Sequence, residues 1–380
     1  MELDEMRVEI NKIDSQLAEL MAKRMKTVES IAKFKAQKNI PIYDPQRERE
    51  KLASLAEQVG GELASVTDTM FSVIFDLSRS AQNKIISGES PIGNQIRKAL
   101  AETEKQFPVR PLIACQGVEG SYSQLACTKI FPAGNIMYFN TFDSVFSAVE
   151  KGLCQYGILP LENSTAGSVN RIYDLMMEHD CYIVRSSRVK VDHCLLVNKG
   201  TKLKDIREIY SHEQAIAQCQ DFLQSLKNVK IIPCENTAAA SKSVQESGRN
   251  DIAALSSLYC AQLYGLECLI DSVQDKGSNF TRFICISKKL EIYPGANRTS
   301  LMAVLPNRRG SLYRVLSRFN TLGINLIKLE SRPLVNSDFD FMFYFDLDTS
   351  VYSDEFLRVF TDLEGAVTRL KYLGSYTELV

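Results

Sequence analysis

The sequence predicts a multidomain protein: an all-α segment, then an α/β segment, then a small α+β sandwich. Its 380 residues are too many for one hydrophobic core. Residues 1–88 show helical periodicity throughout and contain no glycine before the pair Gly60-Gly61. Residues 110–290 alternate short β-like runs with helical stretches, and residues 299–380 read strand, helix, strand, strand, helix, strand. Residues 89–109 read as a linker that carries a short helix.

The composition is that of an ordinary globular protein, with 45% apolar and 24% charged residues. A net charge of −1 without a basic tract argues against nucleic acid as a partner. No run of about 18 apolar residues occurs, and the start MELDEMRVEI lacks a signal-peptide pattern. We therefore expect no membrane partner and a cytoplasmic location.

The cysteines and histidines argue against bound metals. All ten cysteines lie between Cys115 and Cys285, and none is in a C-x-x-C pair. In a cytosolic chain they are expected to be reduced and mostly buried. The chain has three histidines and no H-E-x-x-H motif, so no metal site is expected. No G-x-G-x-x-G follows a strand and no Walker sequence occurs, so we expect no cofactor.

The first helix is expected over residues 3–37. Arg24 sits at the centre of its apolar stripe, and Lys35 is about 20° away at ~100° per residue. The stripe consists of Ile10, Ile13, Leu17, Leu20, Val28 and Ile31. A buried cation is costly unless it is paired, so the two cations indicate snorkelling, a position that fixes oligomer register, or an anion site. Arg7 lies about a quarter-turn away and would reach a neighbouring chain's site if these helices pair.

A second helix is predicted to begin within IYDPQRERE, residues 42–50. Asp44 is the expected N-cap, Pro45 the first helical residue, and Glu48 lies one turn on. Taken alone, this run also fits an ordinary solvated helix start whose charges pair along the helix.

A third helix is expected near residues 66–86, and it places Ser78 and Gln82 inside an apolar stripe. The stripe consists of Phe71, Ile74, Ala81 and Ile85. Polar groups at core positions need partners. With the cations and carboxylates of the other two helices, they describe an anion pocket inside a helix bundle. The pocket has no nucleophile and no histidine base, which suits a dianionic substrate whose reaction is unimolecular.

Residues 3–86 resemble the all-helical chorismate mutases, which are intertwined dimers of three-helix chains. The resemblance implies that Arg24 binds a carboxylate of chorismate and that Arg7 does so from the other subunit. It implies catalytic roles for Lys35 and Gln82, at the ether oxygen whose bond breaks, and for Glu48, at the ring hydroxyl. The remaining implied substrate contacts are Asp44, Arg47 and Ser78.

The middle segment places a Thr-Arg pair at the entry to a buried-looking strand, within GSNFTRFICIS (Gly277–Ser287). Alone, this motif reads as a loop leading into a strand with Arg282 in a salt bridge. Similar polar clusters precede helices in GVEGSYSQLA, PLENSTAGSVNRIYDLM and NTAAASKSV. Because helix N-terminal N–H groups bind anions, several such starts without a P-loop favour a carboxylate-binding cleft.

Through these motifs, residues 110–290 resemble the prephenate dehydratases. The resemblance implies two α/β subdomains with a cleft between them, like periplasmic binding proteins. It implies that prephenate loses carbon dioxide and hydroxide to give phenylpyruvate, with the leading catalytic role at Thr281. Arg282 is our candidate for binding a carboxylate. The other predicted contacts to prephenate are Ser121, Asn163, Ser164, Thr165, Asn236, Thr237 and Phe283.

Residues 297–380 resemble the ACT domains, regulatory modules that bind amino acids between paired subunits. LESRPL (Leu329–Leu334) is the dehydratase-family signature for phenylalanine binding, and its companion loop here is Gly310-Ser311-Leu312-Tyr313 in place of G-A-L-V. Tyr313 is bulkier than valine and would alter affinity. The implied contacts to L-phenylalanine are Gly310, Ser311, Leu312, Glu330, Ser331, Arg332 and Pro333. The alternative is a dimerisation domain with no ligand.

Together the three segments predict a bifunctional chorismate mutase and prephenate dehydratase with phenylalanine feedback, as a homodimer or homotetramer. A non-enzyme alternative is an amino-acid sensor, which would leave the polar residues of the helical seam unexplained. A second enzyme alternative pairs the mutase with a prephenate dehydrogenase, but that needs a dinucleotide-binding loop, which the sequence lacks.

Overall fold

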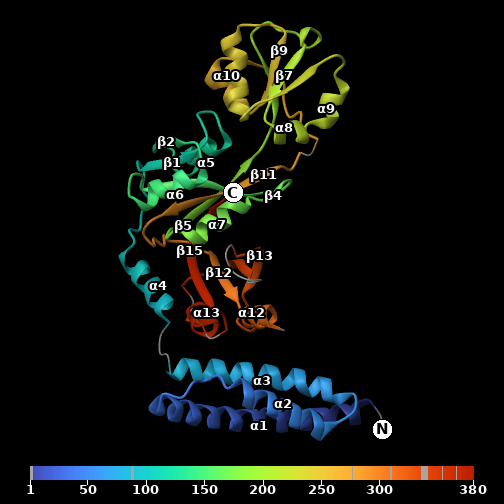
Figure 1. Ribbon diagram of the computed structural model, residues 1–380, viewed down its shortest axis with the longest axis vertical. Helices are drawn as coiled ribbons and strands as arrows, with labels where there is room; N and C mark the ends of the chain where they lie inside the picture. Colours follow the sequence, from blue (N-terminus) through green and yellow to red (C-terminus); the bar gives the residue numbers. More distant parts are fainter. Residues whose placement is uncertain are drawn as a thin grey trace. The chain divides into compact units, whose positions relative to one another are not determined.

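The computed structural model describes residues 3–86, 90–275, 277–308, 310–334, 341–352, 354–364 and 366–380 (Figure 1). Contacts divide the chain into two compact units. The first comprises Met1–Lys98, Ala303–Phe345 and Val351–Leu370. The second comprises Ala99–Met302, Asp346–Ser350 and Lys371–Val380.

The N-terminal segment is helical, as predicted, with helices α1 (Leu3–Lys38), α2 (Pro45–Val59) and α3 (Leu63–Ile86). The predicted start of α2 is confirmed: Asp44 is extended, and its carboxylate accepts a hydrogen bond from the Arg47 backbone N–H at 3.0 Å. Gly60 ends α2 with φ of +69°, a conformation that favours glycine, and its N–H donates to the Ala56 carbonyl.

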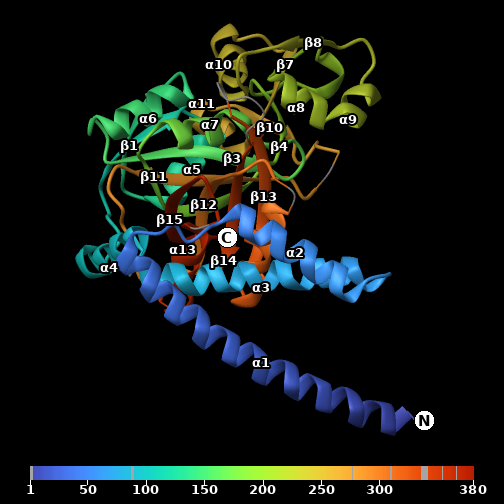
Figure 2. The same cartoon turned by 60° about the horizontal axis from the view of Figure 1, so that its bottom comes forward.

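Helix α1 buries only part of its apolar stripe. Val28 and Ala32 are buried, but the apolar side chains of its N-terminal half are exposed. In Figure 2 this half of α1 extends away from α3. The exposed side chains are Leu3, Met6, Ile10, Ile13, Leu17 and Leu20. An apolar stripe of this length without a cover is what a pairing helix presents.

The short helix expected in the linker is α4 (Pro91–Glu102). Beyond it, Phe107 stacks on Phe131 with ring centroids 4.9 Å apart, and the Arg185 guanidinium lies 3.5 Å from the Phe107 ring centroid. The end of the predicted linker therefore packs into the core of the α/β segment.

One subdomain, the first half of the α/β segment, is built on strands of a single hydrogen-bonded sheet, which the C-terminal strands extend. In the larger sheet the order is β13-β14-β12-β15-β5-β11-β3-β1-β2, and β4 pairs with β3. Strand β1 is parallel to β2 and β3, whereas β11 is antiparallel to β3 and β5. The elements of this half are β1 (Leu112–Gln116), α5 (Tyr122–Ile130), β2 (Asn135–Phe139), α6 (Phe142–Glu150), β3 (Tyr156–Asn163), β4 (Gly167–Ser168), α7 (Asn170–Glu178), β5 (Tyr182–Lys190) and β11 (Phe280–Ser287).

The second half is a separate five-stranded sheet of order β10-β6-β9-β7-β8. Two segments cross between the halves, and they bond to each other: Val191 N–H donates to Asn279 O, and Val273 N–H to His193 O, each at 2.8 Å. The predicted pair of α/β subdomains is thereby confirmed. The elements of the second half are β6 (Cys194–Val197), the 3₁₀ turn Leu203–Asp205, β7 (Glu208–Ser211), α8 (Glu213–Gln218), α9 (Gln220–Ser225), β8 (Lys230–Pro233), α10 (Thr237–Ser247), β9 (Ile252–Ser256), α11 (Leu258–Tyr264) and β10 (Glu267–Ile270).

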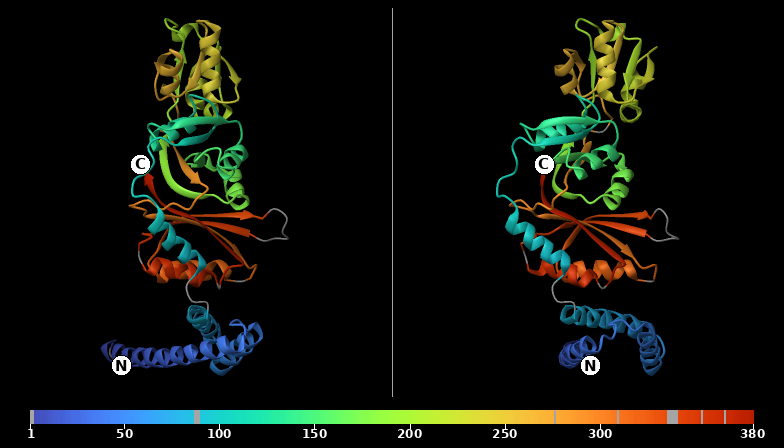
Figure 3. Two further views of the ribbon diagram at one scale, coloured as in Figure 1. Left: turned by 90° about the vertical axis from the view of Figure 1, so that its left-hand side faces the viewer. Right: turned by 60° about the vertical axis from the view of Figure 1, so that its left-hand side comes forward.

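The C-terminal segment has the predicted order strand, helix, strand, strand, helix, strand. Figure 3 shows its two helices on the same face of its strands. This is the arrangement of a ferredoxin-like sandwich. The elements are β12 (Arg298–Leu305), α12 (Ser311–Thr321), β13 (Asn325–Pro333), β14 (Phe341–Asp348), α13 (Asp354–Glu364) and β15 (Arg369–Leu379).

All ten cysteines lie in described residues, and all are free thiols; eight are buried and two half-buried. The expectation that the cysteines are mostly buried is confirmed. Across the described ranges, no cluster of three or more His, Cys, Asp or Glu side chains is placed to hold a metal ion. Within the same ranges, no helix combines the length and the apolar character that a membrane span requires.

Candidate active sites

Of the polar residues in the helical seam, Arg24 and Ser78 contact each other through their side chains. The Arg24 guanidinium donates to Ser78 Oγ and lies 5.6 Å from the Phe75 ring centroid. Burial lowers the Arg24 pKa from its ordinary value. Ser78 and Gln82 are only 5% and 8% exposed. Gln82 Oε1 has no hydrogen-bond partner among the described residues, so this buried acceptor needs a donor that they do not supply.

Lys35 lies in the last turn of α1. Its ammonium donates to the Ile42 carbonyl at 2.7 Å, which ties the end of α1 to the segment before α2. Arg7 is exposed, and within the described part of the chain its one ion pair is with Asp4, at 3.2 Å. Within one chain, therefore, Arg7 does not join the Arg24 site.

Glu48 faces an arginine that the sequence analysis did not single out. Its carboxylate and that of Asp76 both bind the Arg79 guanidinium, which also lies 5.2 Å from the Tyr43 ring centroid. The sequence offered no reason to select Arg79, because an arginine beside the apolar stripe of α3 is expected to be an ordinary solvent-exposed charge. Asp44 and Arg47 are exposed instead, lining an open surface pocket with Gln46, Glu50, Lys51 and Ser54. The structure thus separates Arg47 from Ser78, with which it was predicted to complete one shell.

In the α/β segment, the structure brings Thr281 and Asn163 together across β11 and β3. They are register partners, and Asn163 Nδ2 donates to Thr281 Oγ1 at 2.9 Å. Asn163 Oδ1 accepts the backbone N–H groups of Thr165 and Ala166 at 2.9 and 2.8 Å. These bonds fix which end of the amide faces Thr281. Ser164 closes the same loop, with Oγ bonded to Ser278 O and Phe280 N–H.

A chain of buried polar side chains continues from Asn163 into the second subdomain. Asn163 donates to Asn279 Oδ1 at 2.7 Å, and Asn279 donates to Gln218 Oε1 at 2.9 Å. Gln218 Oε1 also lies 3.0 Å from His193 Nε2. Burial lowers the His193 pKa, more than the contact with Gln218 and the charge of Asp192 raise it. Asn279, Gln218 and His193 stand in loops or at helix ends without periodicity, so the sequence analysis missed them.

Three of the other predicted contacts to prephenate lie at helix starts. Ser121 and Asn236 are the N-caps of α5 and α10, and Thr237 is the first residue of α10. A Cβ at Gly120, where φ is +91°, would lie 3.2 Å from Ala238 Cβ and 3.0 Å from Cys260 Sγ. The two helix starts therefore approach each other across the subdomains, and glycine permits that approach. Two of the predicted contacts lie elsewhere: Thr165 is exposed in the loop after β3, and Phe283 is buried in the core.

Arg282 does not share a face with Thr281, because successive strand residues point to opposite sides of a sheet. It is 5% exposed and bonded to carboxylates and a tyrosine of the chain itself. Its predicted role in binding a substrate carboxylate thus loses its physical support: the guanidinium is turned away from the Thr281–Asn163 pair and already neutralised.

The two predicted phenylalanine-binding stretches occupy a helix start and an edge strand. Gly310 precedes α12 with φ of +76°, Ser311 is buried, Leu312 half-buried and Tyr313 exposed. Glu330, Ser331, Arg332 and Pro333 lie in β13, where half-buried and exposed residues alternate, and β13 is the outermost strand of its sheet.

Comparisons with known proteins agree with these segments. Residues 6–83 match the family model for chorismate mutase type II, and residues 113–291 match the model for prephenate dehydratase. A prephenate dehydratase from Arthrobacter aurescens, solved in complex with L-Phe, is 26% identical, with a TM-score of 0.64 over 70% of this chain and 89% of that chain. A protein described as a novel type of quorum-quenching acylase, GqqA, is 33% identical, with a TM-score of 0.64 over 70% of this chain and 97% of that chain.

Two curated relatives extend the comparison. An Arabidopsis thaliana arogenate dehydratase/prephenate dehydratase is 35% identical over 78% of this chain and 81% of the relative. A bifunctional chorismate mutase/prephenate dehydratase from Aquifex aeolicus is 30% identical over 99% of this chain and 98% of the relative. The two family models and this relative together support both enzyme activities, in preference to the sensor alternative. The chain belongs to the family of bifunctional chorismate mutase/prephenate dehydratases.

Proposed function

We propose that residues 1–88 catalyse the mutase reaction, residues 110–290 the dehydratase reaction, and that residues 297–380 form an ACT domain that binds L-phenylalanine. Residues 89–109 link the first two, and the enzyme works in the cytoplasm without a cofactor. The observation that carries the dehydratase assignment is the hydrogen bond from Asn163 to Thr281.

In the mutase segment, Arg24 binds one carboxylate of chorismate, with Ser78 holding the guanidinium in place. The Claisen rearrangement to prephenate is unimolecular: the ether C–O bond breaks as a new C–C bond forms, and no proton moves. Donors that stabilise the charge developing on the ether oxygen lower the barrier, and this is the role assigned to Lys35 and Gln82. Glu48 holds the ring hydroxyl, and the ion pair with Arg79 orients the Glu48 carboxylate.

The mutase site is completed by a second chain. Among the residues that the structure describes, Arg7 has only Asp4 as a partner, and the apolar stripe from Leu3 to Leu20 is exposed. Pairing of two α1 helices buries that stripe and carries Arg7 to the partner's Arg24 site. The homodimer, or a homotetramer built from two such dimers, follows from this pairing.

In the dehydratase segment, Thr281 assists departure of the ring hydroxyl of prephenate. Because Thr281 Oγ1 accepts from Asn163, its own hydrogen remains available to donate to the leaving oxygen. The bond to the ring carboxylate breaks to release carbon dioxide, its electron pair enters the ring, and the C–O bond breaks. The hydroxide takes up a proton and leaves as water, and aromatisation supplies the driving force.

The carboxylates of prephenate are bound by backbone N–H groups at the starts of α5 and α10, which approach each other at Gly120. The caps Ser121 and Asn236 keep those helix starts in place and leave uncapped N–H groups for the substrate. Arg282 is not needed for this binding, and another role for it is argued below.

Phenylalanine is proposed to bind at the start of α12 and along β13. The Arthrobacter dehydratase with L-Phe bound supports this ligand for the family. Gly310 keeps the backbone approachable, as the signature requires, and the edge position of β13 leaves its backbone open to pairing with a second chain.

The deciding experiment incubates the purified protein with chorismate alone and follows chorismate, prephenate and phenylpyruvate by chromatography, with and without phenylalanine. Phenylpyruvate formation that falls when phenylalanine is added supports all three assignments. Accumulation of prephenate would contradict the role of Thr281, and a phenylalanine-insensitive rate would contradict the regulatory site.

A further inference from the structure

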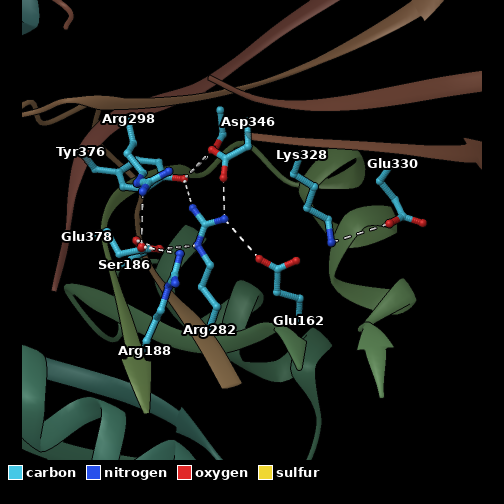
Figure 4. A network of polar contacts seen from close by, with 11 residues as sticks. Glu162, Ser186, Arg188, Arg282, Arg298, Lys328, Glu330, Asp346, Tyr376 and Glu378 are labelled. Carbon is cyan, nitrogen blue, oxygen red and sulfur yellow. Dashed lines mark hydrogen bonds and ion pairs between the residues drawn. The ribbon is translucent and has the colours of Figure 1, made fainter. Parts of the chain in front are cut away.

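Behind the Thr281–Asn163 pair, on the reverse face of the same two strands, lies a cluster of charged side chains centred on Arg282 (Figure 4). Arg282 is the register partner of Glu162, directly after the pair of Thr281 with Asn163. The cluster and the proposed catalytic hydroxyl therefore sit on adjacent residues of one strand and face opposite ways.

The Arg282 guanidinium is engaged on every side by the chain itself. Its Nη1 lies 2.5 Å from Asp346 Oδ2 and 3.3 Å from Glu162 Oε1. Its Nη2 donates to Tyr376 Oη at 3.0 Å, and its Nε lies 2.9 Å from Glu378 Oε1. Three of these four partners come from strands β14 and β15 of the C-terminal segment.

Those partners are themselves held in place. Asp346 is fully buried and accepts a second hydrogen bond from Ser300 Oγ at 2.9 Å, and Ser300 and Tyr376 hydroxyls are 2.6 Å apart. Glu378 also pairs with Arg188 at 2.9 Å and with Arg298 at 3.6 Å. The cluster thus balances three arginines, Arg188, Arg282 and Arg298, with three carboxylates, Glu162, Asp346 and Glu378.

A buried, charge-balanced network of this kind resists small displacements. Arg282, Asp346 and Glu378 have given up nearly all contact with water, at 5%, 0% and 4% exposure, and they are stabilised by partners at close range. Shifting one of these three therefore exposes the others to the cost of desolvation. A planar guanidinium adds directional constraint, since its N–H groups have a fixed geometry. Strand β11 is therefore fixed at Arg282 by residues that arrive from β14 and β15.

We propose that Arg282 is a positioning residue for the dehydratase reaction: anchored by Asp346 and Glu378, it holds β11 so that Thr281 stays in hydrogen-bond contact with Asn163. The C-terminal strands β14 and β15 thereby support the dehydratase site from the opposite face of the sheet. This support does not depend on a ligand bound to the C-terminal segment. This inference rests on the proposed role of Thr281.

The test measures dehydratase kcat and KM in the full-length protein for Arg282→Gln, with the mutase rate and the melting temperature of each variant as internal checks. We expect kcat to fall about 10- to 100-fold with KM changed little, because a small misplacement of a reacting group has an effect of that size. The matched control is Arg171→Gln, which removes an arginine of the same segment that lies outside the cluster and forms exposed ion pairs with Asp143 and Glu178. It should keep kcat within about twofold.

A second readout separates positioning from general destabilisation. If Arg282 acts through Thr281, Arg282→Gln should lower the residual dehydratase rate of a Thr281→Ala variant by no more than about twofold. An equal loss in both backgrounds, or a wild-type kcat in folded Arg282→Gln, would overturn the inference while leaving Thr281 in its role. A fully active Thr281→Ala would instead refute the proposed function. If Arg282→Gln does not fold, Asp346→Asn, which keeps the shape and removes one charge, replaces it, and an unchanged kcat there overturns the inference.

Discussion

Asn163 Nδ2 lies 2.9 Å from Thr281 Oγ1, across the register pair that joins the ends of β3 and β11. Asn163 Oδ1 is already bound by two backbone N–H groups, so the amide can only donate to Thr281. A hydroxyl that accepts such a bond keeps its own hydrogen for a ligand. The geometry therefore turns an ordinary threonine at a strand end into a fixed hydrogen-bond donor.

The first prediction concerns this bond. Asn163→Ala should lower dehydratase kcat about 10- to 100-fold, because the Thr281 hydroxyl loses the group that orients it. Thr281→Ala should lose at least as much, and Thr281→Ser should retain part of the activity. Steady-state assays with prephenate give these rates, and the mutase rate of the same samples shows that the protein is folded. A normal kcat in Asn163→Ala would refute the orienting role.

The second prediction concerns Arg24. Arg24→Ala should lower mutase kcat/KM about 10²- to 10³-fold and leave the dehydratase rate within about twofold, because it removes the cation of a buried anion site in a separate segment. Lys23→Ala, one residue away on the exposed side of α1, is the matched control and should keep both activities. Chorismate consumption measures the first rate and phenylpyruvate formation from prephenate the second. Equal mutase rates in the two variants would contradict the site.

The third prediction concerns the exposed stripe of α1. Leu17→Asp places a charge in the proposed helix pairing surface and should reduce both the mass measured by light scattering and the mutase rate, because Arg7 no longer reaches a partner's site. Val8→Asp is the control: it is 67% exposed, against 52% for Leu17, and lies on the opposite side of the helix at ~100° per residue. A Leu17→Asp protein of unchanged mass and mutase rate would exclude pairing through this stripe.

The fourth prediction concerns phenylalanine control. Gly310→Val forces a β-branched residue to adopt φ of +76°, at a cost of about 1–2 kcal/mol. The loop should change shape, and the phenylalanine concentration for half-inhibition should rise about tenfold, as 1.4 kcal/mol implies. Gly323→Val imposes similar strain at φ of +65° beyond the other end of α12 and should leave inhibition unchanged. Equal responses in the two variants, each normalised to its own uninhibited rate, would contradict a specific site at Gly310.

The sequence predicted those parts of the fold that local patterns control. The 3.6-residue period located the three helices, the Asp44-Pro45 pair located the start of α2, and the alternation of strands and helices gave the α/β and C-terminal segments. The alternation did not predict which strands pair, because pairings such as that of β11 with β3 join segments that are far apart in the sequence.

The candidate sites were predictable only where a polar residue broke an apolar pattern. Arg24, Ser78 and Gln82 were recognisable on that ground, and the structure places all three in the seam. Contacts between distant segments gave no such signal, so Arg79 and His193 were missed. For Arg282 the sequence left two readings open, a salt bridge within the chain and a substrate carboxylate. The structure shows the salt bridges, with Asp346 and Glu378, on the face of β11 opposite Thr281.

The last prediction concerns pH and His193. This imidazole is 2% exposed, and burial lowers its pKa below the ordinary value of about 6.5 that it has in the unfolded chain. Between those two pKa values the unfolded chain binds a proton that the folded chain does not. Stability therefore falls as pH drops below about 6.5, at up to about 1.4 kcal/mol per pH unit, and levels off below the folded-state pKa.

His193→Gln removes this titration, so its free energy of unfolding should fall less than that of the parent between pH 7.5 and 5. Thr281→Ala removes no group that titrates between pH 5 and 7.5, so its curve should run parallel to that of the parent. Urea titrations across that pH range measure the three curves, and parallel curves for parent and His193→Gln would show that His193 does not set the acid sensitivity.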